Sequence, residues 1–547
     1  MTGDPHKAGP IWSGCAEATL PALLHREALR APDAPLLIFE DGLVVTRWDL
    51  AQRVERFAGW LAERTRPGDR MAVLLGSRTE VMVALYAAAA ARIAHVSVPD
   101  GAGLDDAGHI LRNSRARLVV TDSERRSLID RLRRDCPDLE QVVVLDGAEP
   151  DGLGPYAGKE PLALAGSAAA PEDITAVYYT SGTTGPPKGC MVGHIWWRRI
   201  ADVEQRINPK TAADRTLCCL PFHYNDAPIL LTTALNSGGA VVVMRRFSVS
   251  RFWTVVRDNA VTQFVSLGPM PALLLKGEPE PQGDESGDRG HGMKHVHVVG
   301  VPLDQHAELV ARFGCHWIDS YATSESGFIT RVPLDRAAEF VGSGSVGMAV
   351  PEVEIRLLDD HGRDVSEGEI GEYVVRAPGM FSGYLGNEAA TSEAMVGGWY
   401  RTGDRGQRDP DGRYYFAGRK KDIVRRSGEN FAAAEVETVL RAHSKVLEAA
   451  IIPVPDPLRG EEAKAFILPV AGESMESLSP EALVAHCEGR LAAFKIPRYF
   501  EYRREDFPRT PTLRVRKELL RLERADPILG CWDRETGKIV TEESDDG

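Results

Sequence analysis

The chain has 547 residues, of which 43% are hydrophobic and 26% charged, a composition typical of a globular protein with more than one core. Its formal net charge of -14 argues against a chain-wide attraction to nucleic acid or to an anionic membrane. No apolar run reaches the roughly 18 residues of a membrane span, and the N-terminal residues lack the apolar segment of a secretory signal. We therefore expect a cytoplasmic protein that binds neither nucleic acid nor membranes.

Eight cysteines are scattered along the chain without a C-x-x-C pair or a matching histidine spacing. Such spacing supplies neither a zinc cage nor a disulfide framework, so we expect reduced thiols. The positions are Cys15, Cys136, Cys190, Cys218, Cys219, Cys315, Cys487 and Cys531.

Apolar residues between positions 48 and 145 alternate between helical and strand spacing. Helices are predicted at 48–63, 81–91, 105–113 and 124–134, and strands at 70–75, 95–98, 116–121 and 141–145. This alternation is typical of a largely parallel sheet that is covered by helices on both faces.

Two stretches interrupt this pattern, and a different one begins further along the chain. Residues 147–171 are rich in Pro, Gly and Ala, and residues 277–292 carry almost no apolar side chains, which predicts a mobile surface loop. Residues 353–373 predict short strands, and a smaller α+β unit is expected after Gly418. The polar tail from Asp526 is assigned no chemistry.

A glycine-rich loop follows the strand predicted at 174–179. Residues 180–189 read Thr-Ser-Gly-Thr-Thr-Gly-Pro-Pro-Lys-Gly. Glycines let backbone N–H groups approach phosphate oxygens, hydroxyls add donors, and Lys188 adds positive charge. The order differs from that of a Walker loop. Its place directly after a strand favours a nucleoside triphosphate site over a flexible turn.

Three further segments carry compatible chemistry. Residues 320–325 read Ser-Tyr-Ala-Thr-Ser-Glu and offer an aromatic face for a purine and a carboxylate for a hard cation. Residues 399–404 read Trp-Tyr-Arg-Thr-Gly-Asp, and residues 418–422 read Gly-Arg-Lys-Lys-Asp. Each of these three segments alone fits an ordinary turn. Together with the glycine-rich loop they make four motifs, whose order along the chain is that of the family described next.

These four motifs closely resemble those of the adenylate-forming superfamily of acyl-CoA synthetases, peptide-synthetase adenylation domains and luciferases. The resemblance extends from Leu20 to Lys517. It implies an α/β fold with a large N-terminal domain, residues 1–417, of mainly parallel sheets flanked by helices. A small, mobile α+β C-terminal domain, residues 418–547, is expected to hinge at Lys421.

The resemblance also implies a reaction and roles for individual residues. An acid attacks the α-phosphorus of ATP in the presence of Mg²⁺, pyrophosphate leaves, and an acceptor such as coenzyme A takes the acyl group from AMP. The resemblance assigns Thr180, Ser181, Thr183 and Lys188 to the leaving phosphates, and it places Gly182, Thr184 and Gly185 of the same loop at the nucleotide. Ser324 and Glu325 are assigned to the α-phosphate and Mg²⁺, and Asp404 and Arg419 to the ribose. The adenine pocket is assigned to Gly300, Val301, Pro302, Ser320 and Tyr321.

The resemblance also assigns residues to the pocket for the acid. His223 matches the family's gate beside this pocket, although a capped core histidine is the alternative. The neighbouring Asn225 and Asp226 are polar, and a carboxylate in an apolar channel is costly, so we infer a small polar or aromatic acid. The pocket wall is assigned to Val265, Leu267, Pro269 and Met270, which are equally compatible with plain core.

One segment departs from the family pattern. The family normally carries Pro-Arg-Thr-Pro-Thr-Gly-Lys near its C-terminus, and its lysine reaches the acid and the α-phosphate. Here Leu513 replaces the glycine and Arg514 replaces the lysine. Arginine keeps the charge but not the compact ammonium geometry.

Three functions therefore remain open at this point. The first is a ligase that forms an acyl-AMP and transfers the acyl group to coenzyme A. The second is a relative of the ATP-dependent diazotases, which activate nitrite for transfer to an aromatic amine. The third is a non-catalytic relative that binds ATP or AMP. The sequence leaves the oligomeric state undecided.

Overall fold

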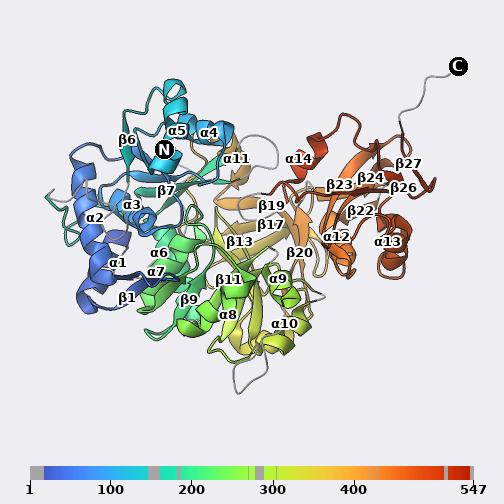
Figure 1. Ribbon diagram of the computed structural model, residues 1–547, viewed down its shortest axis with the longest axis horizontal. Helices are drawn as coiled ribbons and strands as arrows, with labels where there is room; N and C mark the ends of the chain where they lie inside the picture. Colours follow the sequence, from blue (N-terminus) through green and yellow to red (C-terminus); the bar gives the residue numbers. More distant parts are fainter. Residues whose placement is uncertain are drawn as a thin grey trace.

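The described residues form four β-sheets, three of them in a large N-terminal domain and one in a small C-terminal domain (Figure 1). The structure is a computed structural model that describes residues 18–145, 160–180, 187–268, 270–277, 289–303, 305–419, 422–427, 429–509 and 515–541. The α/β fold that the sequence predicts is confirmed.

The first sheet has six strands, in the order β6 (Gln141–Val144), β5 (Leu118–Thr121), β3 (Arg70–Leu74), β4 (Ala94–Ser97), β7 (Ile174–Thr180) and β8 (Lys188–Gly193). All neighbours are parallel except β7 and β8, which are antiparallel. The nearby helices are α1 (Leu20–Arg30), α2 (Arg47–Ala62), α3 (Thr79–Ala90), α4 (Leu104–Ser114) and α5 (Ser123–Leu132). The helices and strands predicted between 48 and 145 are all present, and their ends lie within about three residues of the prediction.

Successive residues of β3 face different cores, as the twofold period of a strand requires. Met71 and Val73 belong to the core that contains α3, whereas Ala72 and Leu74 belong to the core that contains α4 and α5. The sheet is therefore covered on both faces, as predicted.

The second sheet has nine strands, in the order β15 (Met348–Ala349), β14 (Gly327–Arg331), β13 (His316–Thr323), β12 (His295–Val299), β11 (Gln263–Leu267), β9 (Arg215–Cys218), β10 (Ala240–Val243), β1 (Pro35–Phe39) and β2 (Val44–Thr46). Within this sheet all neighbouring strands are parallel along the series β13, β12, β11, β9, β10 and β1. The helices of this region are α6 (His194–Ile207), α7 (Asp226–Ser237), α8 (Val249–Asp258), α9 (Met270–Lys276) and α10 (His306–Phe313). The loop predicted at 277–292 falls largely outside the described residues.

The third sheet is antiparallel and corresponds to the short strands predicted from residue 353 onward. Its order is β16 (Glu354–Leu358), β17 (Gly371–Arg376), β19 (Trp399–Arg408) and β18 (Met395–Val396), and β20 (Tyr414–Arg419) pairs with β19. Helix α11 (Glu388–Ala394) precedes β18.

The C-terminal domain is built on a mixed sheet that occupies one end of the molecule (Figure 1). Its order is β22 (Glu429–Ala432), β21 (Ile423–Arg426), β24 (Gly460–Pro469), β25 (Tyr499–Tyr502), β26 (Trp532–Asp533) and β27 (Lys538–Ile539), with β23 (Val446–Asp456) also paired to β24. Its helices are α12 (Ala433–Arg441), α13 (Pro480–Cys487) and α14 (Lys517–Leu522). Its two core clusters contain only residues from Val424 onward. The smaller α+β unit is therefore present, and the boundary between residues 417 and 418 stays a prediction.

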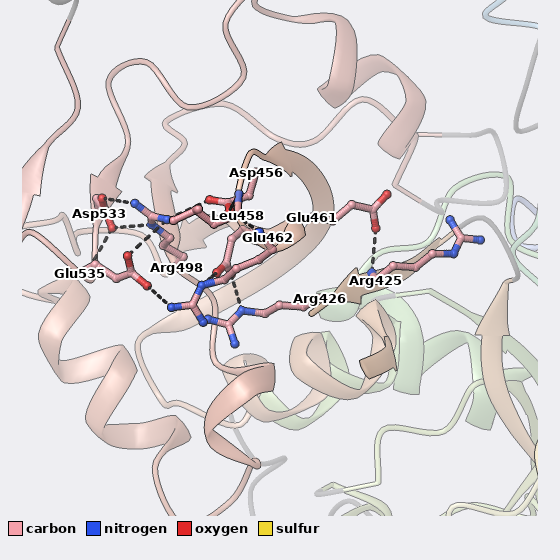
Figure 2. Close-up of polar contacts among 10 residues, drawn as sticks. Arg425, Arg426, Asp456, Leu458, Glu461, Glu462, Arg498, Asp533 and Glu535 are labelled. Carbon is pink, nitrogen blue, oxygen red and sulfur yellow. Dashed lines mark hydrogen bonds and ion pairs between the residues drawn. The ribbon is translucent and has the colours of Figure 1, made fainter. Parts of the chain in front are cut away.

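The tail after Asp526 is part of the C-terminal fold, which the sequence analysis did not anticipate. Strand β26 adds to the sheet beside β25, and Asp533 forms an ion pair with Arg498. Glu535 contacts both Arg498 and Arg459 (Figure 2). In the same network the buried Glu462 pairs with Arg426 of β21 at 2.8 Å (Figure 2). These contacts tie the tail to the strand that follows the predicted hinge.

The structure also bears on the expectations for the cysteines, for metal sites and for membrane spans. The seven cysteines in the described ranges are free, and Cys15 lies outside them. Among the described residues, no cluster of three or more His, Cys, Asp or Glu side chains is arranged to hold a metal ion. No helix in that part of the chain is long and apolar enough to cross a membrane.

Candidate active site

Tyr384 links the lysine of the phosphate loop to the predicted magnesium carboxylate. Thr180 ends β7 and Lys188 begins β8, and the two residues are register partners on adjacent antiparallel strands. The Lys188 ammonium lies 5.0 Å from the centre of the Tyr384 ring. The Tyr384 hydroxyl donates a 2.8 Å hydrogen bond to Oε1 of Glu325, which is buried. A cation and a carboxylate are thus held on one aromatic side chain.

Tyr321 and Asp404 form a second buried contact. The Tyr321 hydroxyl donates a 2.7 Å hydrogen bond to Oδ2 of Asp404, and Nε of Arg419 lies 3.4 Å from Oδ1. Asp404 and Arg419 are register partners on β19 and β20. The Tyr321 ring packs against Tyr373 and Phe416. The predicted adenine and ribose residues therefore meet at one place.

Asp319 shapes the segment assigned to the adenine pocket. Its carboxylate accepts hydrogen bonds of 2.9 Å from the backbone N–H groups of Gly300 and Val301, and one of 2.7 Å from Ser320. Gly300 has φ +85°, a conformation that favours glycine, and Pro302 follows in the same turn. Burial raises the pKa of Asp319 to about 6, even though the three N–H donors oppose this shift.

His223 is buried beside Asp100 at the start of the segment that leads into α7. Its Nδ1 lies 3.4 Å from the Asp100 carboxylate, and its carbonyl accepts a 2.5 Å hydrogen bond from Ser97. Burial lowers the pKa of His223 to about 4, more than the Asp100 charge raises it, so the ring is neutral at pH 7. Asn225 is the residue before α7, and Asp226 lies in its first turn.

A cavity lies between α7 and the strands β9, β11, β12 and β14. Its apolar wall includes Ile229, Leu230, Val265 and Phe328. Its polar wall includes Glu204, Lys210, Thr233, His295, His297 and Arg331. It adjoins the nucleotide segment because Nε2 of His297 lies 2.5 Å from Oγ of Ser320, the neighbour of Tyr321.

The predicted pocket residues divide between this cavity and the surrounding core. Val265 lines the cavity, whereas Leu267 and Met270 are buried in the main core and are not part of the cavity lining. His223, Asn225 and Asp226 precede the lining residues of α7 without lining the cavity themselves. Ser324 is half-buried next to Glu325.

Several predicted site residues lie outside the described part of the chain. They are Ser181, Gly182, Thr183, Thr184, Gly185, Pro269, Lys421, Leu513 and Arg514. On either side of 510–514, Arg509 and Val515 form an antiparallel bridge. The nearby Lys517 is engaged elsewhere, because its Nζ lies 2.6 Å from Oε1 of Glu437.

Sequence reasoning missed the residues that position the predicted ones. Glu325 is contacted by Tyr384, and Tyr321 is contacted by Tyr373. The Gly300 turn is contacted by Asp319. Tyr384 follows Ser382 and Gly383, and this Ser-Gly pair indicates a turn. A turn signal marks where Tyr384 lies along the chain, but it does not indicate the contact with Glu325. Asp319 had no such signal, since its partners lie 18 and 19 residues away.

Comparison with known proteins identifies the family. The family model of the AMP-binding enzymes matches residues 24–385, and that of the AMP-binding enzyme C-terminal domain matches residues 435–513. This chain belongs to the AMP-binding enzyme family. The resemblance predicted from the four motifs is thereby confirmed, and the chain is an ATP-dependent, AMP-forming ligase.

Relatives within the AMP-binding enzyme family span almost the whole chain. Crotonobetaine/carnitine–CoA ligase of Escherichia coli O7:K1 is 30% identical over 492 residues, covering 87% of this chain and 93% of that protein. o-Succinylbenzoate CoA synthetase of Bacillus subtilis, solved with its acyl-adenylate intermediate, is 26% identical with a TM-score of 0.79 over 92% of this chain and 98% of that one. An anthranilate CoA ligase solved with anthranoyl-AMP has a TM-score of 0.81 at 23% identity, over 92% of this chain and 96% of that one. Neither of the two relatives with at least 25% identity is named for nitrite, so the diazotase alternative gains no support from them.

Proposed function

We propose that this enzyme activates a small carboxylic acid as its AMP anhydride and then transfers the acyl group to coenzyme A. The observation that carries the proposal is the Lys188–Tyr384–Glu325 array. It places one cation and one carboxylate around a fixed aromatic ring at the mouth of the phosphate loop. Catalysis of this kind depends on positioning and on neutralising phosphate charge.

Each part of the site has a distinct task in this proposal. Lys188 holds the leaving pyrophosphate, and Glu325 would hold Mg²⁺. A single carboxylate suits Mg²⁺ in such sites because ATP phosphates and water complete its oxygen shell. When bound, Mg²⁺ neutralises phosphate charge. Asp404 accepts hydrogen bonds from the ribose, and Tyr321 with the Gly300 turn encloses the adenine.

The acid pocket is proposed to lie at the carboxyl ends of β11 and β12, beside the Gly300 turn, with Val265, Leu267 and Met270 as its wall. The void beside His297 does not serve as this pocket, because it has room for about one water molecule. His223 closes the proposed pocket as a neutral side chain.

Arg514 supplies the remaining positive charge in this proposal. Lys517 pairs with Glu437 in the observed arrangement, and its neighbour Glu437 also accepts a hydrogen bond from the backbone of Ile451. Moving Lys517 to the acid would therefore leave the buried carboxylate of Glu437 without its cation, which is costly. Arg514 keeps a permanent positive charge at the position of the family's lysine.

Coenzyme A is the proposed acceptor because the relatives named above with at least 25% identity are CoA ligases by name. A pyrophosphate-release screen over small aliphatic and aromatic acids tests the proposal. We expect release that depends on a carboxylic acid, and acyl-CoA formation when coenzyme A is added. Glu325→Gln is the inactive control. Release that needs nitrite and an arylamine, with no response to any carboxylic acid, would overturn the proposal.

A further inference from the structure

Helix α4 contacts both the end of β7 and the start of β8. Nε2 of His109 lies 2.8 Å from the carbonyl oxygen of Pro187, which directly precedes β8. Four residues further along the helix, Oδ1 of Asn113 accepts a 2.7 Å hydrogen bond from the hydroxyl of Tyr179 on β7. Side chains four positions apart lie on the same face of a helix, so one face of α4 is turned toward these two strands.

The contact at Pro187 is a hydrogen bond that His109 donates. A carbonyl oxygen only accepts hydrogen bonds, so the proton lies on Nε2 of the ring. Proline has no N–H group, so this carbonyl is the backbone group through which Pro187 can be held by a hydrogen bond. The bond therefore restrains the residue next to Lys188.

The hydrogen bond between Asn113 and Tyr179 joins α4 to β7. The Tyr179 ring also meets the His109 ring edge-on, with 6.0 Å between the ring centres. Tyr179 packs closely against β8 as well, because a Cβ atom at Gly189 would lie 3.1 Å from its ring. His109 therefore belongs to a packed group of side chains that leaves little room for Gly189, the neighbour of Lys188, to move.

These contacts point to a role for His109 in nucleotide binding. We propose that His109 is a positioning residue for ATP, which holds the backbone beside Lys188 so that the ammonium group meets the leaving phosphates. His109 does not touch the nucleotide in this proposal, and its effect passes through the carbonyl of Pro187. The inference rests on the proposed function, in which Lys188 holds the leaving pyrophosphate.

A role of this kind predicts a selective effect on nucleotide binding. ATP carries the β- and γ-phosphates that Lys188 holds, and AMP lacks both. A misplaced Lys188 should therefore weaken the binding of ATP and leave that of AMP unchanged. A residue that merely stabilises the fold would affect both nucleotides alike or neither of them.

Calorimetric titration of His109→Phe with ATP and Mg²⁺, and separately with AMP, tests the proposal. Phenylalanine keeps a ring beside Tyr179 and removes the donor to Pro187. We expect the Kd for ATP to rise about threefold to tenfold, as is usual for one lost hydrogen bond between uncharged groups, with no change for AMP. His109→Gln replaces the donor with a side-chain amide N–H and should recover most of the affinity. If His109→Phe does not fold, His109→Asn, which is polar but too short to reach the carbonyl, carries the same expectation.

A double-mutant cycle tests whether the effect passes through Lys188. Lys188→Ala alone should raise the Kd for ATP. Adding His109→Phe to Lys188→Ala should then raise the Kd by less than about twofold further, because two residues that act through one contact do not contribute additively.

The matched control is His486→Phe in the C-terminal domain. Nε2 of His486 lies 2.9 Å from the carbonyl oxygen of Val439, so this variant loses the same kind of hydrogen bond at another place. It should lower the melting temperature about as much as His109→Phe does, and it should leave the Kd values for ATP and AMP unchanged.

The results separate the inference from the proposed function, because nucleotide binding requires neither the acid nor the acceptor. An unchanged Kd for ATP in His109→Phe, equal changes for ATP and AMP, or full additivity with Lys188→Ala overturns the inference. Each of these outcomes leaves the proposed function intact as long as Lys188→Ala weakens ATP binding. If Lys188→Ala binds ATP as tightly as the wild type, the proposed role of Lys188 fails and the inference fails with it.

Discussion

The hydroxyl of Tyr384 donates a 2.8 Å hydrogen bond to the carboxylate of Glu325, 59 residues away, while its ring lies under the ammonium of Lys188. One side chain therefore sets the separation of the two charges that the proposed reaction places on opposite sides of the phosphates.

Tyr384→Phe should retain the ring contact with Lys188 and lose only the hydrogen bond to Glu325. We expect pyrophosphate release to fall by about tenfold or more, because a hydrogen bond to a charged group contributes about 1.5–3 kcal/mol. The loss should be accompanied by a higher Mg²⁺ concentration for half-maximal rate, because the carboxylate is less well positioned. A fall in rate with an unchanged Mg²⁺ dependence would contradict the positioning role.

Lys188→Ala and Glu325→Gln should each lower pyrophosphate release by more than about tenfold, since each removes a charge that neutralises phosphate or holds the metal. Stopped-flow or coupled assays at saturating ATP provide the measurement. Lys538→Ala, which removes an exposed cation of β27 in the C-terminal domain, is the control. Equal rates in the two site variants and the wild type would show that the phosphate loop is structural.

Arg514→Lys should preserve or raise adenylation of carboxylic acids, because it restores the family's point charge at this position. The measurement is pyrophosphate release over small aliphatic acids, aromatic acids and nitrite, with and without an acceptor. If the variant gains nothing with any carboxylic acid and release depends on nitrite, the site has been rebuilt for another acid.

Lys421→Pro should impair acyl transfer more than adenylation. The small domain is proposed to rotate about this position between the two half-reactions, and proline restricts the backbone there. Single-turnover measurement of acyl-AMP formation and of its consumption by coenzyme A separates the two steps. Equal losses in both steps would argue against a hinge at this residue.

The enzyme should lose stability as the pH falls from about 6.5 toward 4. Burial lowers the pKa of His95 and His194 to about 4, whereas the same groups in the unfolded chain titrate near their ordinary value of 6.5. Between these two values the unfolded state binds more protons, so the free energy of unfolding rises with pH and falls on acidification. For His95 alone the loss is on the order of 3 kcal/mol.

His95→Leu isolates this contribution. His95 is 1% exposed, and neither of its ring nitrogens has a partner among the described residues, so leucine should leave stability at pH 7 equal or higher. Denaturant unfolding at several pH values should show a smaller acid loss in the variant. The same acid loss in both proteins would rule out His95 as its source.

Local sequence determined the elements and the order of the chemical motifs. The strand at 70–74 and the helix that follows it are specified by apolar periodicity, and the phosphate loop by glycines and hydroxyls directly after a strand. Both features are set by residues close together in the sequence. The alternation of such strands and helices over residues 70–145 is what predicted a parallel sheet covered on both faces. The resemblance of the motifs to one family was likewise readable without coordinates.

Tertiary structure alone decided which side chains meet. Tyr321 reaches Asp404 across 83 residues, and Glu204 reaches Arg331 across 127. The candidate wall of Val265, Leu267, Pro269 and Met270 stays a prediction, whereas the ion pairs of Lys210 and Arg331 with Glu204 were not foreseen. The physical reason is that the charged side chains come from segments far apart in the chain, and they meet only after the sheet has formed. The polarity of the cavity that they line therefore cannot be predicted from any single stretch of sequence.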